Sequence, residues 1–233
     1  MNKTKKVWPS VAVTTMVAFF LMIGVTPATP ADSPIFIPFN IPGADQTSGY
    51  GINPAGQVVG SYVGSDTVEH GFLLREGVFG LLSAGVYETI DVLGATLTRP
   101  RGINPAGQIV GQCGVGGKTY GFLLSDSNLT LLDVPGATST SAMGINPEGD
   151  VVGWYAMGGI EHGFLWKPDS GFTDVDYPGA AGTNARGINP DGDIVGLWWG
   201  AGPAFPSWSA RRAGKTSAPS SGVGNWNRTT ITG

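Results

Sequence analysis

One ten-residue motif occurs four times in this chain, and it constrains the fold more than any other feature. It reads GINPAGQVVG from Gly51, GINPAGQIVG from Gly102, GINPEGDVVG from Gly144 and GINPDGDIVG from Gly187. The four starts lie 51, 42 and 43 residues apart. A period of this size indicates a repeat architecture, in which one supersecondary unit is copied and stacked on its neighbours.

The Asn-Pro-x-Gly centre of the motif predicts a tight turn. Asn is favoured at the first position of a type I turn, Pro supplies the backbone angle of the second, and Gly is favoured at the fourth. Asn53, Pro54 and Gly56 hold these positions in the first copy, and the β-branched pair Val58-Val59 follows. We therefore expect each motif to be the bend of a β-hairpin.

Other elements recur at fixed distances from this motif. A Gly-Ala step precedes it by 8 residues in every copy, and a second motif follows it in three copies as His-Gly-Phe-Leu or Tyr-Gly-Phe-Leu, starting at His70, Tyr120 and His162. No stretch beyond the N-terminus has the apolar spacing of a helix. Four short β-segments in about 42 residues are typical of a propeller blade. The prediction is an all-β, propeller-like array of four-stranded antiparallel blades, with three full repeats, partial repeats at each end, and closure of the ring left open.

The N-terminus resembles a processing signal. Three lysines in the first six residues precede an apolar run from Val11 to Val25, and small residues follow up to Ala31. The run is shorter than the roughly 20 apolar residues of a membrane span. We expect residues 1–31 to be a signal peptide and residues 32–199 to be a β-repeat domain that is secreted or periplasmic, without a stable membrane span after cleavage. An uncleaved anchor is the alternative.

The fourth copy departs from the pattern. The spacing of the second and third copies puts its His-Gly-Phe equivalent at 205–207, where the chain has Phe205-Pro206-Ser207. Residues 200–233 show no alternation and carry four basic residues and no acidic one. A functional basic tail is one interpretation. We prefer a degenerate or truncated repeat, and expect 200–233 to be disordered and dispensable.

Charge and cysteine content narrow the possible partners. All 17 acidic residues lie between Asp32 and Asp193, with six basic residues, which gives this segment a charge of −11. Such an acidic body argues against a nucleic-acid partner. Cys113 is the single cysteine, so no intramolecular disulfide can form.

The two motifs together resemble those of the bacterial extracellular HAF-repeat family, named for its His-Ala-Phe triplet. The resemblance covers roughly Phe36 to Trp199. This chain has Gly where the family name has Ala, and Tyr120 replaces His in the second copy. The resemblance implies a secreted bacterial protein with propeller-like repeats, and it brings no activity and no catalytic residues.

Glu69, His70, Glu161 and His162 are the candidates for a functional site, because His70 and His162 are the only histidines and each follows a glutamate at the same place in its repeat. They could ligate one metal or form a catalytic pair. The preferred interpretation is a hydrogen bond inside each repeat, because the second copy has Thr119-Tyr120 there and structural metal sites need about four ligands. No catalytic, cofactor or metal site is predicted.

The sequence therefore favours a secreted, non-catalytic binding or interaction module whose extracellular ligand is a glycan or a protein. The alternative is an enzyme, a lyase or a glycan hydrolase, that uses a central propeller cavity. An enzyme should break the repeat symmetry with carboxylates or histidines that converge in one pocket.

Overall fold

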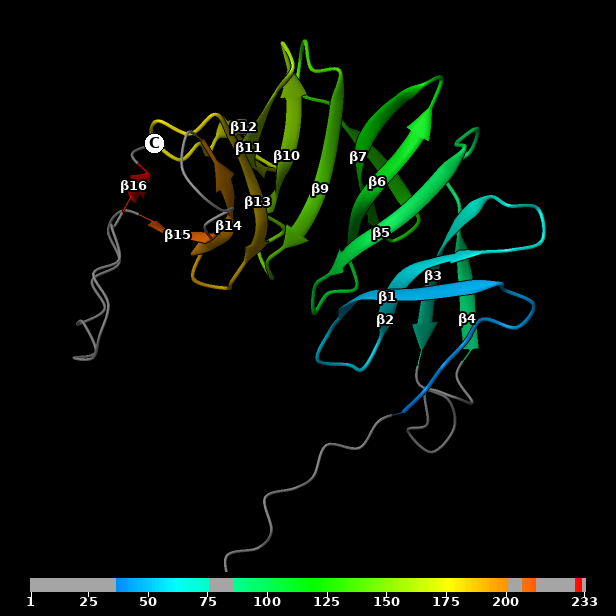
Figure 1. The fold of residues 1–233 in the computed structure, drawn as a ribbon. Helices are drawn as coiled ribbons and strands as arrows, with labels where there is room; N and C mark the ends of the chain where they lie inside the picture. Colours follow the sequence, from blue (N-terminus) through cyan, green and yellow to red (C-terminus); the bar gives the residue numbers. More distant parts are fainter. Residues whose placement is uncertain (1–36, 76–85, 201–206, 213–228, 232–233) are drawn as a thin grey trace, which may run out of the picture. The chain divides into compact units, whose positions relative to one another are not determined.

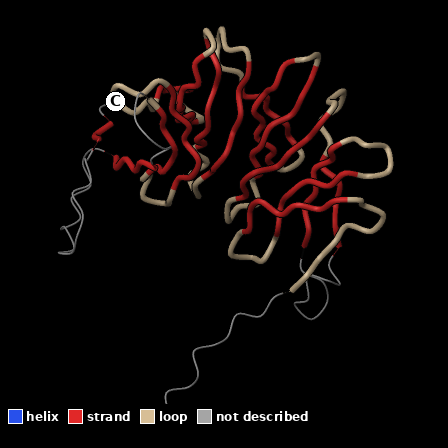
Figure 2. The backbone as a smooth tube through the Cα atoms, in the orientation of Figure 1, coloured by secondary structure: helices blue, strands red, loops and turns tan. Residues whose placement is uncertain are grey.

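The computed structural model describes residues 37–75, 86–200, 207–212 and 229–231. These residues form sixteen β-strands and no helix (Figure 2), so the all-β prediction is confirmed. Among the described residues there is accordingly no helix that could span a membrane. We group the strands into four units, each of which contains one copy of the GIN motif (Figure 1).

Unit 1 contains β1 (Gln46–Ile52), β2 (Val58–Val63), β3 (Glu69–Arg75) and β4 (Val86–Ile90). Unit 2 contains β5 (Leu97–Ile103), β6 (Ile109–Val115), β7 (Lys118–Ser125) and β8 (Asn128–Leu132). Unit 3 contains β9 (Ser139–Ile145), β10 (Val151–Met157), β11 (Ile160–Lys167) and β12 (Gly171–Asp174). Unit 4 contains β13 (Gly182–Ile188), β14 (Ile194–Trp199), β15 (Ser207–Arg212) and β16 (Thr229–Ile231).

Consecutive strands pair antiparallel within units 1 to 3. Single parallel bridges, Glu69 with Leu97 and Thr119 with Ser139, join these three units into one 12-stranded sheet. Unit 4 forms a separate 4-stranded sheet. In the part of the chain that is described, β1 pairs only with β2, so the sheet is not closed.

The predicted turns are confirmed. The Gly56 amide donates to the Asn53 carbonyl at 2.9 Å, and Gly56 has φ of 74°, the left-handed conformation that favours glycine. The same turn recurs in the other units at Gly107, Gly149 and Gly192. Each GIN motif is therefore the bend between the first and second strands of its unit.

The asparagine of the motif also links one unit to the next. The buried Asn104 side chain accepts a hydrogen bond from the Gln108 amide at 3.0 Å, and its Nδ2 donates to the Asn146 carbonyl of unit 3 at 3.0 Å. Asn53 donates in the same way to the Asn104 carbonyl at 3.2 Å. The turn residue is thus also a contact between neighbouring units.

The first glycine of the motif allows the units to approach each other closely. A Cβ on Gly51 would lie 3.1 Å from the Arg101 carbonyl oxygen and 3.2 Å from the Gly102 Cα in unit 2. Gly102 and Gly144 face the next unit in the same manner. A Cβ on Gly102 would lie 3.3 Å from the Met143 carbonyl oxygen, and a Cβ on Gly144 would lie 3.2 Å from the Arg186 carbonyl oxygen. A larger residue here would push the first strands of neighbouring units apart.

A repeated threonine holds the connection into each unit. It lies four residues before the motif, at Thr47, Thr98, Thr140 and Thr183. Thr98 Oγ1 accepts a hydrogen bond from the Val92 amide at 3.1 Å, and the other three accept from the amide six residues earlier in the same way. This residue recurs in the sequence as regularly as the motif itself.

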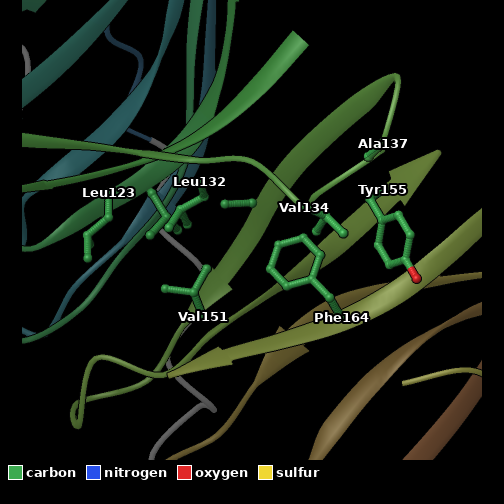
Figure 3. Close-up of a cluster of buried hydrophobic side chains, with 9 residues drawn as sticks. Leu123, Leu132, Val134, Ala137, Val151, Tyr155 and Phe164 are labelled. Atoms are coloured by element: carbon green, nitrogen blue, oxygen red, sulfur yellow. The ribbon is translucent and has the colours of Figure 1, made fainter. Parts of the chain in front are cut away.

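The hydrophobic core consists of clusters that extend across pairs of units. In the cluster of Figure 3, Leu123 and Leu132 from unit 2 pack with Val151 and Phe164 from unit 3. Phe164 and its equivalents Phe72 and Phe122 are fully buried. Each unit therefore completes the core of its neighbour, as expected of stacked repeats.

The sequence prediction is wrong about strands after Trp199. β15 pairs antiparallel with β14 and places Trp208 opposite Gly196, as β3 places Phe72 opposite Gly60. The His-Gly-Phe equivalent is therefore 206–208 and not 205–207, because unit 4 has the spacing of unit 1. β16 pairs parallel with β15. Apart from Gly200, β15 and β16, the segment 200–233 lies outside the described residues.

We expect the third strand of unit 4 to contribute to stability. Ala210 of β15 is buried in one cluster with Ile194 and Val152. A chain that ends at Gly200 should therefore melt more than about 5 °C below the whole chain, which corresponds to 1–2 kcal/mol in a domain of this size. A chain that ends at Arg212 is the matched control and should melt within about 2 °C of the whole chain. Equal melting temperatures for the two truncations would contradict the role of β15.

We also expect Asn104→Ala to lower the free energy of unfolding by about 2–3 kcal/mol, because the half-buried Gln108 and the buried Asn146 carbonyl lose their partner. Asn189→Ala is the control, since Asn189 is exposed and water can replace its contacts, and it should cost about 1 kcal/mol. Urea denaturation of both variants tests this difference.

Candidate functional site

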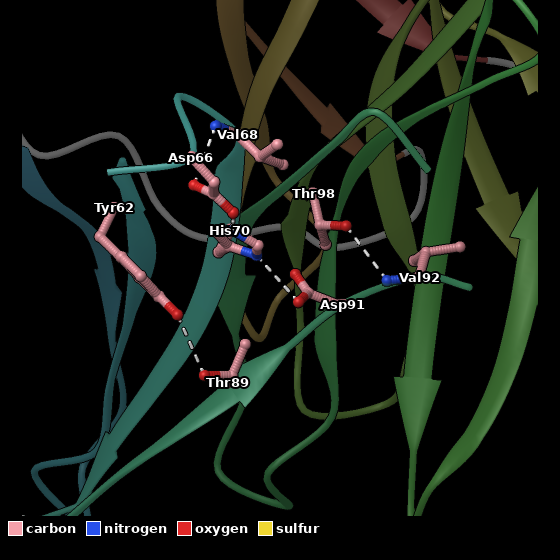
Figure 4. A network of polar contacts seen from close by, with 8 residues as sticks. All are labelled: Tyr62, Asp66, Val68, His70, Thr89, Asp91, Val92 and Thr98. Carbon is pink, nitrogen blue, oxygen red and sulfur yellow. Dashed lines mark hydrogen bonds and ion pairs between the residues drawn. The ribbon is translucent and has the colours of Figure 1, made fainter. Parts of the chain in front are cut away.

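His70 at the start of β3 lies in a polar network within unit 1 (Figure 4). Its Nδ1 lies 2.9 Å from Asp91 Oδ2, its Nε2 lies 3.0 Å from Asp66 Oδ2, and its ring stacks on Tyr62 at 5.2 Å between centroids. Hydrogen bonds to Asp66 and then to Asp91 raise the pKa of His70, because only the protonated imidazole donates to both.

The equivalent contacts recur in the other units. His162 Nδ1 lies 2.7 Å from Asp176 Oδ2, and the ring stacks on Tyr155 at 5.1 Å. In unit 2, where Tyr120 replaces the histidine, Lys118 Nζ lies 2.8 Å from Asp133. In each of these three units, the aspartate after the fourth strand therefore pairs with a basic side chain of the third strand.

The two candidate glutamates lie at contacts between units. Glu69 accepts hydrogen bonds from Ser61 Oγ and from Arg99 Nε of unit 2, both at 2.6 Å, and its second oxygen also pairs with Arg99. Burial acts to raise the pKa of Glu69, but the hydrogen bonds from Arg99 and Ser61 outweigh it and lower that pKa. Glu161 accepts from Asn184 Nδ2 of unit 4 at 2.5 Å.

The contact between units 2 and 3 uses a different pair. Ser141 Oγ donates to Gln112 Oε1 at 2.6 Å. Besides the asparagine contacts of the turns, three hydrogen-bonded side-chain pairs therefore join the units, and we call them the polar pairs: Glu69–Arg99, Gln112–Ser141 and Glu161–Asn184.

The structure gives each of the four candidates a partner set of its own. No contact of the described residues joins His70 to His162 or Glu69 to Glu161. The same residues contain no group of three or more His, Cys, Asp or Glu side chains arranged to hold a metal ion.

One row of residues was not predicted from the sequence to be a site. It lies immediately before the four GIN motifs and consists of Tyr50, Arg101, Met143 and Arg186; we call it the bulge row. At each of them the register between the first and second strands shifts by one residue, so the residue is an unpaired β-bulge. Bulges redirect side chains and are common beside functional sites. The four side chains differ, although the motif after them is nearly constant.

Arg101 has the most unusual environment in the bulge row. Its guanidinium carbon lies 4.4 Å from the Tyr50 ring centroid, and its Nε is buried without a hydrogen-bond partner. Burial, and then the positive charges of Arg99 and Arg186, lower the pKa of Arg101. Ion pairs of the described residues involve neither Arg101 nor Arg186. The charge of Glu69 acts on Arg101 in the opposite direction, so Arg101 lies near a carboxylate but forms no ion pair with it.

Two cavities adjoin these contacts. A small cavity of about 160 Å³ is lined by Tyr50, Ser61, Glu69 and Arg99, next to the bulge row. A groove of about 750 Å³ lies between units 1 and 2, and its charged lining residues are Arg75, Glu88, Asp91 and Asp126. Arg75 pairs with Glu88, and Asp91 pairs with His70. The small cavity is lined by Tyr50 of the bulge row, which also contacts Arg101, so we place the candidate site there and along the bulge row.

Comparison with known proteins supports the fold alone. No protein-family model and no curated protein matches the chain. Among solved structures, TolB from Acinetobacter baumannii is similar at a TM-score of 0.55 and 16% identity over 72% of this chain and 41% of its own. A streptogramin B lyase aligns at a TM-score of 0.45 and 14% identity over 73% of this chain and 57% of its own. The chain has a propeller-like fold. It spans less than two thirds of either neighbour.

The contacts of His70 predict a pH-dependent contribution to stability. The raised pKa of the folded state means that this contribution is fully present below the unfolded value of 6.5 and is lost as pH rises through the folded pKa. His70→Gln should therefore lower the melting temperature by about 2 °C near about pH 5.5 and leave it unchanged near about pH 9.

Arg75→Gln is the control, because it removes an exposed ion pair of the same strand whose guanidinium stays charged over this range. Its effect on the melting temperature should be the same at both pH values. An effect of His70→Gln that does not change with pH would contradict the assignment of a protonated His70.

Proposed function

We propose that this chain is a secreted or periplasmic, non-catalytic binding module of the HAF-repeat type, built from four-stranded propeller blades, which binds an anionic ligand along its bulge row. The observation that carries the proposal is the pair Arg101 and Arg186, two arginines at equivalent bulges of a repeated scaffold that take part in none of the ion pairs of the described residues.

The residues that follow the repeat symmetry already have structural partners. The motif glycines and asparagines hold neighbouring units together, and His70 and His162 pair with aspartates of their own units. In the bulge row the units differ, and its only side-chain contact described above is that of Arg101 with Tyr50. Function on a repeated scaffold belongs at such positions, because the scaffold is shared and the site is specific.

The side chains of the bulge row favour a ligand that carries a carboxylate. A guanidinium presents its donors in a fork that matches a carboxylate, and Arg101 keeps one buried donor without a partner. The exposed Tyr50 ring beside it offers an aromatic face to a sugar or a peptide. An acidic glycan or an acidic peptide segment supplies both the charge and the flat surface.

The contacts of the candidate acids and bases favour binding over catalysis. A lyase or glycan hydrolase needs an acid and a base that reach one substrate atom. The candidate acids and bases Glu69, His70, Glu161 and His162 have separate partners in this fold.

The test is calorimetric titration with an oligogalacturonate, with a neutral galactose oligosaccharide of equal length as the matched ligand. We expect binding of the acidic oligosaccharide only, and a weakening of about tenfold, or about 1.4 kcal/mol, for Arg101→Gln and for Arg186→Gln. Arg75→Gln is the control variant because its guanidinium is already paired with Glu88. Equal binding of the neutral oligosaccharide, or an equal loss with Arg75→Gln, would refute the bulge row as the site.

A further inference from the structure

One apolar contact recurs at each of the three junctions between neighbouring units. The second β-branched residue after the turn of one unit packs in a cluster with the GIN isoleucine of the next: Val59 with Ile103, Val110 with Ile145, and Val152 with Ile188. All three valines are 0% exposed. We call this contact the unit joint.

The two ends of the array expose the two halves of this joint. Ile52, the GIN isoleucine of unit 1, is 66% exposed, whereas its equivalent Ile103 is 8% exposed. Val195, the joint valine of unit 4, is 50% exposed. A Cβ on Gly187 would contact only Val195 of its own unit, whereas the equivalent glycines meet the next unit.

We propose that a second copy of this chain docks end to end, with the Ile52 face of one copy on the Val195 face of the other. The two faces are complementary because they are the halves of a joint that this chain already forms three times. Such a contact is heterologous, and it either closes two copies into a ring or continues into a filament. This inference does not depend on the anionic ligand.

The polar residues of the exposed faces are compatible with this contact. Between units 1 and 2 the joint also contains the ion pair of Glu69 and Arg99. The residue of unit 1 at the position of Arg99 is Ser48, and the residue of unit 4 at the position of Ser61 is Leu197. An end-to-end contact would therefore leave neither of these positions with a buried, unpaired charge, which would be costly.

The test is sedimentation velocity of the full chain over a concentration series, with Ile52→Glu, Val195→Glu and their equimolar mixture. We expect the unaltered chain to reach at least the mass of two copies and each variant alone to stay at the mass of one copy. The mixture should form a species of two copies and no larger one, because one intact Ile52 face and one intact Val195 face remain. Only a heterologous contact predicts this rescue.

Leu93→Glu is the control, since Leu93 is an exposed apolar residue outside the joint, and it should associate like the unaltered chain. If Val195→Glu does not fold by circular dichroism, Val195→Thr replaces it and should weaken association about tenfold. A single-copy mass for the unaltered chain at every concentration would overturn the proposal. So would a mixture that stays at one copy, or an Ile52→Glu variant that still associates, because another surface or partner would then be responsible.

Discussion

The structure depends on the close approach of the first strands of neighbouring units. A Cβ on Gly51, Gly102 or Gly144 would press on the backbone of the next unit at 3.1 to 3.3 Å, so the neighbouring strands would have to move apart. Because the backbones come so near, the Asn53 and Asn104 side chains reach a carbonyl of the next unit. The apolar joints and the polar pairs between units follow from this spacing. The motif is therefore a hairpin turn and an inter-unit contact in the same ten residues.

The local turns and the repeating unit could be predicted from the sequence. The contacts between units and the position of β15 could not, because they depend on how the strands pair. The turn at Asn53, Pro54 and Gly56 follows from the conformations those residues prefer, and the period predicted the repeating unit. The second role of the asparagine is a contact between residues 51 positions apart, which turn preferences do not describe. β15 was missed because one extra residue moves the equivalent of Phe72 to Trp208, so a search at fixed spacing ended one position early.

The candidate site was predicted in part. The repeated histidines suggested partners within each unit, and the aspartates that bind them recur at fixed positions, as Asp91 and Asp176. The bulge row could not be found from composition, because a bulge is one extra residue between two paired positions of a strand and depends on the register with its partner strand. A signal was present in the sequence. The position before each motif changes from Tyr50 to Arg101, while the glycine after it is constant.

The chemical difference between the polar pairs has a consequence for how the chain folds. Near-identical hairpins can stack out of order, and such misassembly is a characteristic failure of repeat proteins. Stacking unit 3 directly on unit 1 would place Glu69 against Ser141 in place of Arg99, and the carboxylate would lose its counterion at a half-buried position. Such an unpaired charge is costly. At the junction of units 1 and 2, a side chain that varies between the repeats thus favours the observed neighbour among near-identical hairpins.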